Sequence, residues 1–409
     1  MATTQSEQFG QQMIAAIEEH KQEIVQVARE IHAHPETAFE EHVASKLLVE
    51  AMQRHDFKVE YPVGGLETAF CATKSGQGKG PAVAVLAEYD ALPGLGHGCG
   101  HNLIAASGLA TAIALGPVIE QLTGTFMVIG TPAEEGGGGK VRLIDAGVFQ
   151  GVDAALMVHH AGDKTGAPTR YPGGTSLAVT ELTFAFRGKS AHAAADPWEG
   201  ANALNAVIKL FTGIDALRQH IRPEARIHGI ITHGGDAPNV VPHYATAQFL
   251  VRAPSRDYVQ VLEEKIRKIA QGAALMTETT VEITQEGLNY YDMRPSYVLG
   301  RRYAEHMRAV GMEVNSGDQG VRLSASTDFA NVSYLMPAVT GSFAISRMPI
   351  RGHSQEVVDA SCSEYGLEQL LKVSQAMALT ALDLFTEPEL LAEAKTEHVH
   401  WAERYEGKQ

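Results

Sequence analysis

The chain has 409 residues, of which 44% are hydrophobic and 20% are charged, and its formal net charge at pH 7 is −15. This profile is typical of a globular protein with room for two domains, and it excludes a disordered chain. The negative charge argues against nucleic acid as a partner. No apolar run approaches the roughly 20 residues that a membrane-spanning helix needs, so we expect no membrane partner either.

Three cysteines, Cys71, Cys99 and Cys362, are too few for a disulfide framework. The N-terminal segment MATTQSEQFGQQ lacks the basic and then apolar pattern of a secretory signal. We therefore expect a cytoplasmic protein, in which a cysteine is free to act as a metal ligand or as a nucleophile.

The N-terminal part of the chain alternates between helical and strand-like patterns. Apolar side chains three and four residues apart predict a helix from about residue 13 to 31, ended by Pro35, and another over 43–52. Continuous apolar runs predict strands that are buried on both faces. These strands are expected at 81–90, 124–130 and 153–160, and a helix of small residues at 103–119. Strands that alternate with helices indicate an α/β fold with a mainly parallel sheet.

From Ser176 onward the expected order becomes strand, helix, strand, strand, helix, strand, which is the ferredoxin-like α+β pattern. We interpret residues 177–289 as a domain inserted into the first one, which then comprises 1–176 and 290–409. Its strands are expected at 176–188, 225–235, 245–255 and 279–287, and its helices at 197–217, with Pro197 at the start, and 257–275. A helix at 297–310, a strand at 339–346, a long helix at 357–385 and a charged tail follow.

Polar side chains follow three of the expected strands. Asp90 comes after the first strand, Glu134 and Glu135 after the second, and His159 and His160 end the third. In open α/β sheets, sites form at the carboxyl ends of the strands. We therefore expect these side chains to border one site.

The segment GLGHGCGHNL (94–103) adds a cysteine and a histidine two residues apart. A Cys-x-His loop can place a thiolate and an imidazole on one ion, and glycine lets the backbone turn tightly. The segment AEEGGGG (133–139) supplies carboxylates, and His353 lies in a loop that begins with glycine. Five or six such ligands suit one or two divalent ions, zinc or manganese.

These residues lie in segments that resemble a family of metal-dependent amidohydrolases, which includes aminoacylase, the auxin-conjugate hydrolases and the p-aminobenzoyl-glutamate hydrolase subunits. The segments occur in family order and span most of the chain: IHAHPETAFEE, EYDALPGLGHGCGHN, GTPAEEGGGGK, GKSAHAAADPWEGANAL, HGGDAPNVVP and GHSQE. The forms GHGCGHN and EEGGGGK look closest to the aminobenzoyl-glutamate hydrolase and dipeptidase-like branch. The resemblance implies a catalytic α/β/α domain with an inserted lid and dimerisation domain. It also implies hydrolysis of small N-acyl or N-aminoacyl amino acids with a free carboxylate.

The same resemblance implies roles for individual residues. The implied metal ligands are Cys99, His101, Glu135, His159 and His353. Glu134 would be the general base, and His192 would stabilise the oxyanion in the other subunit of a homodimer. Asn239 and Arg252 would bind substrate, with Arg252 holding its carboxylate.

The chain departs from the family at residues 88–90, which read Glu-Tyr-Asp. Many relatives have His-x-Asp there, and that histidine binds metal. We expect Cys99 and His101 to take over this role, with Asp90 orienting a ligand from behind. The substitution leaves the number and identity of the ions open.

Three further assignments rest on fewer sequence features. His159 is preferred to His160 as the ligand because it follows the apolar strand at the family's ligand position. His97 is interpreted as a structural residue or as one that supports a ligand. Asp328 either caps a helix or lines the site, and the sequence does not separate these two roles.

The leading hypothesis is amide hydrolysis by metal-activated water, with Glu134 taking the proton and delivering it to the departing amine. A rival makes Cys99 a covalent nucleophile with His101 or His353 as its base, which predicts irreversible alkylation and indifference to chelators. Another rival is a catalytically silent metal-binding partner subunit of a hetero-oligomeric hydrolase. The presence of both Glu134 and Glu135 argues against a silent site.

Overall fold

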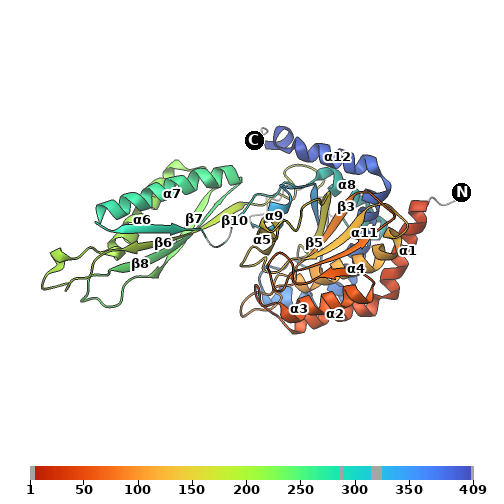
Figure 1. Cartoon of the computed structure of the whole chain (residues 1–409), viewed down its shortest axis with the longest axis horizontal. Coiled ribbons are helices and arrows are strands. Elements are labelled where there is room, and N and C mark those ends of the chain that lie inside the picture. Colours follow the sequence, from red (N-terminus) through yellow and green to blue (C-terminus); the bar gives the residue numbers. More distant parts are fainter. Residues whose placement is uncertain (1–4, 286, 288, 315–324, 407–409) are drawn as a thin grey trace. The chain divides into compact units, whose positions relative to one another are not determined.

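The computed structural model describes residues 5–285, 287, 289–314 and 325–406. The chain divides into two compact units (Figure 1). Unit 1 comprises residues 1–175, 293–323 and 327–409, and unit 2 comprises residues 176–292 and 324–326. The chain thus leaves unit 1 and returns to it, and unit 2 contains the predicted insertion at 177–289.

Unit 1 is built on a six-stranded mixed sheet with the strand order β1-β2-β4-β3-β5-β11. β3, β4, β5 and β11 are parallel, while β2 is antiparallel to β4 and β1 is antiparallel to β2. The predicted α/β fold with a mainly parallel sheet is confirmed. The strands are β1 (Lys58–Glu60), β2 (Phe70–Ser75), β3 (Ala82–Ala87), β4 (Thr125–Gly130), β5 (Ala154–His160) and β11 (Ala338–Phe343).

Helices cover both faces of this sheet, which gives the predicted α/β/α layering (Figure 1). Side chains alternate along β3, so Val83 and Val85 pack in the larger core, whereas Ala84 and Leu86 pack in the core on the other face. The helices of unit 1 are α1 (Gln5–Glu19), α2 (Lys21–Ala33), α3 (His42–Arg54), α4 (His101–Ile119), α5 (Gly139–Asp145), α8 (Tyr297–Ala309), α9 (Phe329–Val332), α10 (Gln355–Ala360), α11 (Glu364–Thr386) and α12 (Pro388–Val399), with a π-helical turn at Ala402–Glu406.

Two of the expected helices are wrong in extent. The helix expected over 13–31 is divided into α1 and α2 at His20, which leaves helical geometry (φ −93°, ψ 13°). The helix expected over 357–385 is divided into α10 and α11. There Ser363 is extended, and its hydroxyl accepts the N–H of Gly366, which starts a new helix.

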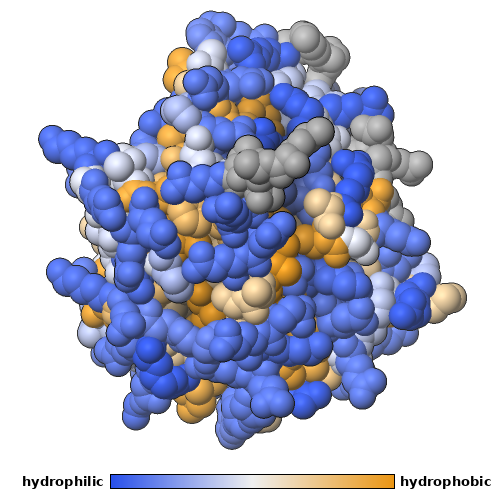
Figure 2. Space-filling view, turned by 90° about the vertical axis from the view of Figure 1, so that its right-hand side faces the viewer, coloured by the Kyte–Doolittle hydropathy of each residue, from blue (hydrophilic) through white to orange (hydrophobic). Residues whose placement is uncertain are grey.

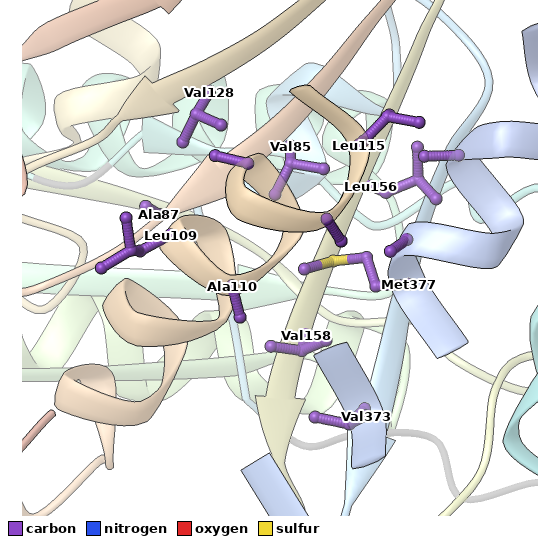
Figure 3. Close-up of a cluster of buried hydrophobic side chains, with 14 of the residues drawn as sticks. Val85, Ala87, Leu109, Ala110, Leu115, Val128, Leu156, Val158, Val373 and Met377 are labelled. Carbon is purple, nitrogen blue, oxygen red and sulfur yellow. The ribbon is translucent and has the colours of Figure 1, made fainter. Parts of the chain in front are cut away.

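The larger core of unit 1 surrounds α4. This 19-residue helix is long and apolar enough to span a membrane, contrary to the expectation that no run approaches that length, but 94% of it is buried inside the protein. By contrast, hydrophilic side chains cover most of the molecular face in Figure 2. α4 is therefore a core helix. Figure 3 shows its contacts with β3, β4, β5 and α11 through Val85, Ala87, Leu109, Ala110, Leu115, Val128, Leu156, Val158, Val373 and Met377.

Unit 2 is the predicted ferredoxin-like domain. All strand pairs of its sheet are antiparallel, and β6 lies between β8 on one side and β9 and β10 on the other, with β7 at the far edge. Pro197 begins a separate 3₁₀ turn and not the long helix, which starts after its cap at Asn202. The elements are β6 (Ala178–Arg187), η1 (Pro197–Glu199), α6 (Ala203–Leu217), η2 (Arg218–His220), β7 (Arg226–His233), β8 (Tyr244–Ala253), α7 (Arg256–Met276), β9 (Thr280–Thr284) and β10 (Asn289–Tyr290).

Candidate metal centre

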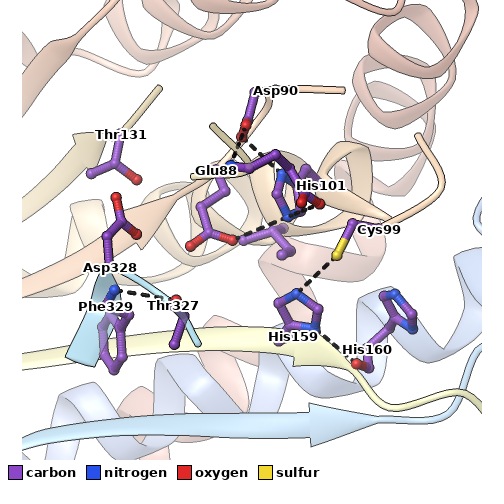
Figure 4. Close-up of polar contacts among 12 residues, drawn as sticks. Glu88, Asp90, Cys99, His101, Thr131, His159, His160, Thr327, Asp328 and Phe329 are labelled. Atoms are coloured by element: carbon purple, nitrogen blue, oxygen red, sulfur yellow. Dashed lines mark hydrogen bonds and ion pairs between the residues drawn. The ribbon is translucent and has the colours of Figure 1, made fainter. Parts of the chain in front are cut away.

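The loop between β3 and α4 carries the cysteine and the first histidine. Gly100 has φ +67°, and a Cβ atom there would lie 2.9 Å from Cδ2 of His160, so both conformation and space favour glycine. α4 begins at His101, whose ring is fully buried. Its Nδ1 atom lies 2.9 Å from Oδ1 of Asp90 (Figure 4), which leaves Nε2 as its candidate ligand atom. Asp90 thus orients His101, as carboxylates behind metal-bound imidazoles do.

The two histidines at the end of β5 have different surroundings. Nδ1 of His159 lies 2.8 Å from the carbonyl oxygen of His160, so Nδ1 carries the hydrogen and Nε2 keeps a free lone pair. That Nε2 lies 3.6 Å from Sγ of Cys99 (Figure 4). The ring of His160 stacks on that of His159, and its Nδ1 accepts the N–H of Gly162 at 3.4 Å. These contacts support His159 as the ligand.

The glutamate pair lies on the loop after β4. Ala133 has φ +61°, and its carbonyl oxygen accepts the N–H of Gly137 at 3.0 Å, so the loop turns sharply before the pair. The N–H of Glu135 donates to Oδ2 of Asp90 at 2.9 Å. Oε1 of Glu135 lies 3.8 Å from Nε2 of His101. The carboxylate of Asp90 thus holds both this loop and His101.

His353 reaches the same place from the loop between β11 and α10. It has φ +55°, and its N–H donates to the carbonyl oxygen of Gly98 at 3.1 Å, which ties this loop to the cysteine loop. Its side chain is 57% exposed, and Nε2 lies 3.5 Å from Oε1 of Glu135. The structure therefore brings together all five predicted metal ligands.

The ligand atoms form overlapping groups in which every atom lies within 4.8 Å of the others. Two ligands of one tetrahedral zinc ion lie about 3.3–3.8 Å apart, which the shorter distances here match. Two of the groups share the thiol of Cys99. The groups are Cys99–His101–His159, Cys99–Glu135–His353 and His101–Glu134–Glu135.

The charges at this centre call for a cation. Among the described residues, Nε2 of His101 and Oε1 of Glu135 are buried without a hydrogen-bond partner. Burial raises the pKa of the Cys99 thiol, so a bound cation is needed to keep the thiolate. Burial, followed by repulsion from Glu88 and Asp328, also raises the pKa of Glu134. Sulfur, nitrogen and oxygen atoms gathered in this way fit one or two divalent ions.

Beside this centre lies a buried ionic cluster, Glu88–Lys140–Asp328. Nζ of Lys140 lies 2.7 Å from Oε1 of Glu88 and 2.6 Å from Oδ1 of Asp328, and all three side chains are fully buried. Burial disfavours the ammonium form, but the two carboxylates outweigh it and raise the pKa of Lys140. Glu88, Glu134 and Asp328 could also group around a metal. Lys140 already supplies a cation to two of them.

Sequence reasoning noted Glu88 only as a departure from the family, missed Lys140 and left Asp328 open. Asp328 does not cap α9 with its side chain, and its Oδ2 accepts the backbone N–H of Lys140 at 2.9 Å. The available signal was a lysine directly after four glycines, at the start of a helix. Gly139 has no space for a Cβ atom, which would lie 1.8 Å from the carbonyl oxygen of Pro132. Lys140 points inward to Glu88 and Asp328, which come from distant segments, so only the fold reveals its position.

The three predicted lid residues lie in unit 2. The N–H groups of Ala194 and Ala195 donate to Nδ1 of His192 at 3.2 and 3.1 Å, so the neutral ring carries its hydrogen on Nε2. The N–H of Ala193 donates to the carbonyl oxygen of Asn239, so His192 and Asn239 are neighbours. Nη1 of Arg252, on β8, donates to Oγ of Ser326 at 2.8 Å. Their functional roles stay predictions.

Two other histidine sites are explained without a ligand. Nε2 of His97 lies 3.0 Å from the carbonyl oxygen of Ile31, and burial lowers the pKa of this ring to about 3, so it is a neutral structural residue. His20, Glu23 and His55 lie close enough to hold an ion. However, Glu23 already pairs with Arg54 at 2.9 Å and His55 at 3.0 Å. This group is satisfied as an ion-pair network that links α2 to the end of α3.

The sequence is similar to known proteins over most of its length. Residues 174–278 match the family described as "Peptidase dimerisation domain". The chain is 38% identical to the Xaa-Arg dipeptidase of Mus musculus, covering 93% of this chain and 90% of the relative. It is 34% identical to one of the p-aminobenzoyl-glutamate hydrolase subunits of Escherichia coli, covering 94% of this chain and 93% of the relative.

Solved structures show the same fold. A dinuclear metal-binding peptidase of the M20 family from Bacillus subtilis is similar, with a TM-score of 0.68 and 21% identity, covering 90% of this chain and 99% of that one. An aminobenzoyl-glutamate utilization protein from Klebsiella pneumoniae is similar with a TM-score of 0.70 and 21% identity, covering 91% of this chain and 98% of that one. At these identities the likeness concerns the fold.

Proposed function

The chain belongs to the M20 peptidase family and is a hydrolase of amide bonds, and on that basis we propose that it is a metal-dependent dipeptidase or N-acyl amino acid hydrolase. The observation that carries the metal dependence is the pair of ligand groups that share the Cys99 thiol. We propose that Cys99, His101, Glu135, His159 and His353 would hold one or two divalent ions, zinc or manganese.

The proposed ligands form two sets that share Cys99. One set is Cys99, His101 and His159, and the other is Cys99, Glu135 and His353. When bound, divalent ions supply a water molecule whose pKa is lowered toward about 7 and polarise the scissile carbonyl. The protein fixes the ligand directions, since Asp90 holds His101 and the His160 carbonyl holds His159.

Glu134 is proposed as the general base. Its carboxylate lies within 4.8 Å of ligand atoms of His101 and Glu135, so it lies beside the proposed ligands. It takes a proton from the attacking water as the water oxygen bonds to the carbonyl carbon. It then gives that proton to the amide nitrogen as the carbon–nitrogen bond breaks. The products are a carboxylic acid and a free amine, so atoms and charge balance.

His192 is proposed to stabilise the oxyanion from the other subunit of a homodimer. Its Nδ1 is occupied as an acceptor, so Nε2–H is available to donate. The apolar edge strand β7, with Ile230 62% and Ile231 44% exposed, supports dimerisation through unit 2. Light scattering should report a dimer, and charged substitutions at both isoleucines should produce monomers.

A mixed dimer tests the action of His192 across subunits. Glu134→Gln and His192→Ala subunits, each inactive alone, should regain about a quarter of the wild-type activity when mixed randomly, because half of the dimers then hold one intact site. Restored activity is expected only if the two residues come from different subunits. Failure to complement, despite verified exchange, contradicts the assignment.

The substrate class is proposed from the relatives named for Xaa-Arg dipeptides and p-aminobenzoyl-glutamate. Both compounds end in an amino acid with a free α-carboxylate, which Arg252 and Asn239 are proposed to bind. Hydrolysis should be measured on Xaa-Arg dipeptides, p-aminobenzoyl-glutamate and N-acetyl amino acids, with chelator and with zinc or manganese restored. We expect the protein to cleave dipeptides, and we expect the chelator to abolish this cleavage.

The same screen separates the alternatives. Turnover that survives the chelator and is destroyed by alkylation of Cys99 indicates the covalent mechanism. Metal binding without turnover on any conjugate, with or without added relatives as partner subunits, indicates a silent subunit. A cytoplasmic location, which the three free thiols at Cys71, Cys99 and Cys362 support, stays a prediction.

A further inference from the structure

The loop that carries Glu134 and Glu135 is held through its backbone at both ends and in the middle. In each case a buried carboxylate accepts one N–H of the loop at 2.9 Å. Two of these carboxylates belong to the metal centre or to the ionic cluster described above. The pairs are Glu41 with the N–H of Ala133, Asp90 with that of Glu135, and Asp328 with that of Lys140.

Glu41 differs from the other two because it lies outside both clusters. It is the last residue of the segment IHAHPETAFEE and directly precedes α3. Its side chain is fully buried. Oε1 accepts the N–H groups of Phe39 at 3.0 Å and Ala133 at 2.9 Å, and Oε2 accepts the hydroxyl of Thr68 at 2.7 Å. Two of these contacts fix the backbone at Phe39 and Ala133, and the third, from Thr68, holds the carboxylate itself in place.

The residue that Glu41 holds is strained. Ala133 has φ +61°, in the left-handed region that costs a residue with a Cβ atom about 1–2 kcal/mol. Strain of this kind persists when neighbouring contacts enforce it, and it clusters at functional sites. Ala133 directly precedes Glu134, so its backbone conformation sets the direction in which the Glu134 side chain leaves the loop.

We propose that Glu41 is a positioning residue for the glutamate pair, which aims Glu134 and Glu135 by holding Ala133 in its left-handed conformation. The proposal deepens the proposed function and rests on it for the roles of the pair. It predicts that loss of the Glu41 acceptor lets the loop relax and moves both carboxylates. A displacement near 1 Å can lower turnover by about 100-fold.

The test compares Glu41→Ala, Glu41→Gln and Glu36→Ala. Glutamine keeps an acceptor for the N–H of Ala133, and is the conservative rescue. Glu36 is the matched control, since its carboxylate also accepts two backbone N–H groups, those of Val43 and Ala44, but it lies at the start of α3 and not at the loop.

Two readouts separate positioning from folding. In steady-state kinetics, Glu41→Ala should lower kcat by about 10–100-fold with KM within about threefold of wild type, whereas Glu41→Gln should restore most of kcat and Glu36→Ala should leave it unchanged. In metal-free protein, amide hydrogen exchange of a peptide spanning residues 131–140 should accelerate in Glu41→Ala only.

The exchange readout needs no activity, so it tests the proposal even if no substrate is found. Unchanged exchange in this peptide in a folded Glu41→Ala protein overturns the proposal. Equal losses of kcat in the Glu41→Ala and Glu36→Ala proteins also overturn it, because they show a general effect on folding. Absence of hydrolysis in the wild type, with the exchange result as expected, overturns the proposed function and leaves the positioning role intact.

Discussion

Two buried clusters at the carboxyl edge of the unit 1 sheet handle negative charge in different ways. In the cluster around Lys140, the chain supplies its own cation, and the ammonium lies within 2.7 Å of two carboxylates. In the cluster around Cys99, a thiol, imidazoles and carboxylates lie together, and Oε1 of Glu135 lies 3.8 Å from Nε2 of His101 and 3.5 Å from Nε2 of His353, both candidate ligands. The first cluster therefore holds its own counter-ion, whereas the second is the one proposed to take an ion from solution.

We expect the strongest effect on activity at Glu134, where the two clusters meet. Its carboxylate lies close to His101 and Glu135 on one side and to Glu88 and Asp328 on the other. Glu134→Gln should lower kcat by about 10²–10⁴-fold, because the amide cannot take the proton from water. Metal analysis of the purified variant should match the wild type. Near-normal turnover would remove Glu134 from the mechanism.

Lys140→Met should break the ion balance of the structural cluster. Removing one partner leaves buried carboxylates uncompensated, so the free energy of unfolding of unit 1 should fall by about 3–5 kcal/mol. Fluorescence of the buried Trp401 in a Trp198→Phe background reports on unit 1 during urea unfolding. Adding Asp328→Asn should recover part of the loss, whereas wild-type stability in Lys140→Met would contradict the structural role.

Glu41 shows a third way to keep a buried carboxyl group. Burial raises its pKa from the usual 4.5 of a glutamate to about 7, so the group carries a proton in about half of the molecules at neutral pH. Its folded pKa lies above the unfolded one, so its contribution to stability is fully present below about pH 4.5 and is lost as pH rises through 7. The loss approaches about 3 kcal/mol, which Glu41→Gln should abolish. The free energy of unfolding of the metal-free wild type and Glu41→Gln proteins should be measured at pH 5.5 and 8.5. An equal change between the two pH values in both proteins would refute this prediction.

The weakest effect is expected at Asp90, which touches the centre only through other residues. Asp90→Asn keeps the shape but weakens the bond to His101, so metal affinity should fall by about 10–100-fold. Competition with a chromophoric chelator measures the affinity. A matched change at Asp153, whose carboxylate accepts the N–H of Ala82 at the other end of β3, should leave the affinity unaltered.

Much of this fold can be predicted from the sequence because long apolar runs and glycine-rich turns are local signals. The strands β3, β4 and β5, the helix α4 and the succession of strands and helices along unit 2 follow from periodicity and turn residues. Helix breaks at His20 and before Ser363 were missed, although polar residues surround both of them. The short strand β1 and helix α5 carry too few residues for a periodic signal.

The candidate site divides in the same way. Residues with unusual chemistry in glycine loops, such as Cys99, His101 and His353, stand out in the sequence, and the resemblance to a family added their roles. Glu88, Lys140 and Glu41 do not stand out, because an ordinary glutamate or lysine is expected at the surface. Their burial and pairing depend on segments that are distant in the sequence.

The placement of His101 at the first residue of α4 has a kinetic consequence. α4 is buried along nearly its whole length, so His101 cannot leave an ion unless much of unit 1 opens. His353 is largely exposed on a loop and can swing away. An ion held by His353 should therefore exchange with solvent quickly and one held by His101 slowly, so incubation with a second metal should yield mixed-metal protein before full replacement.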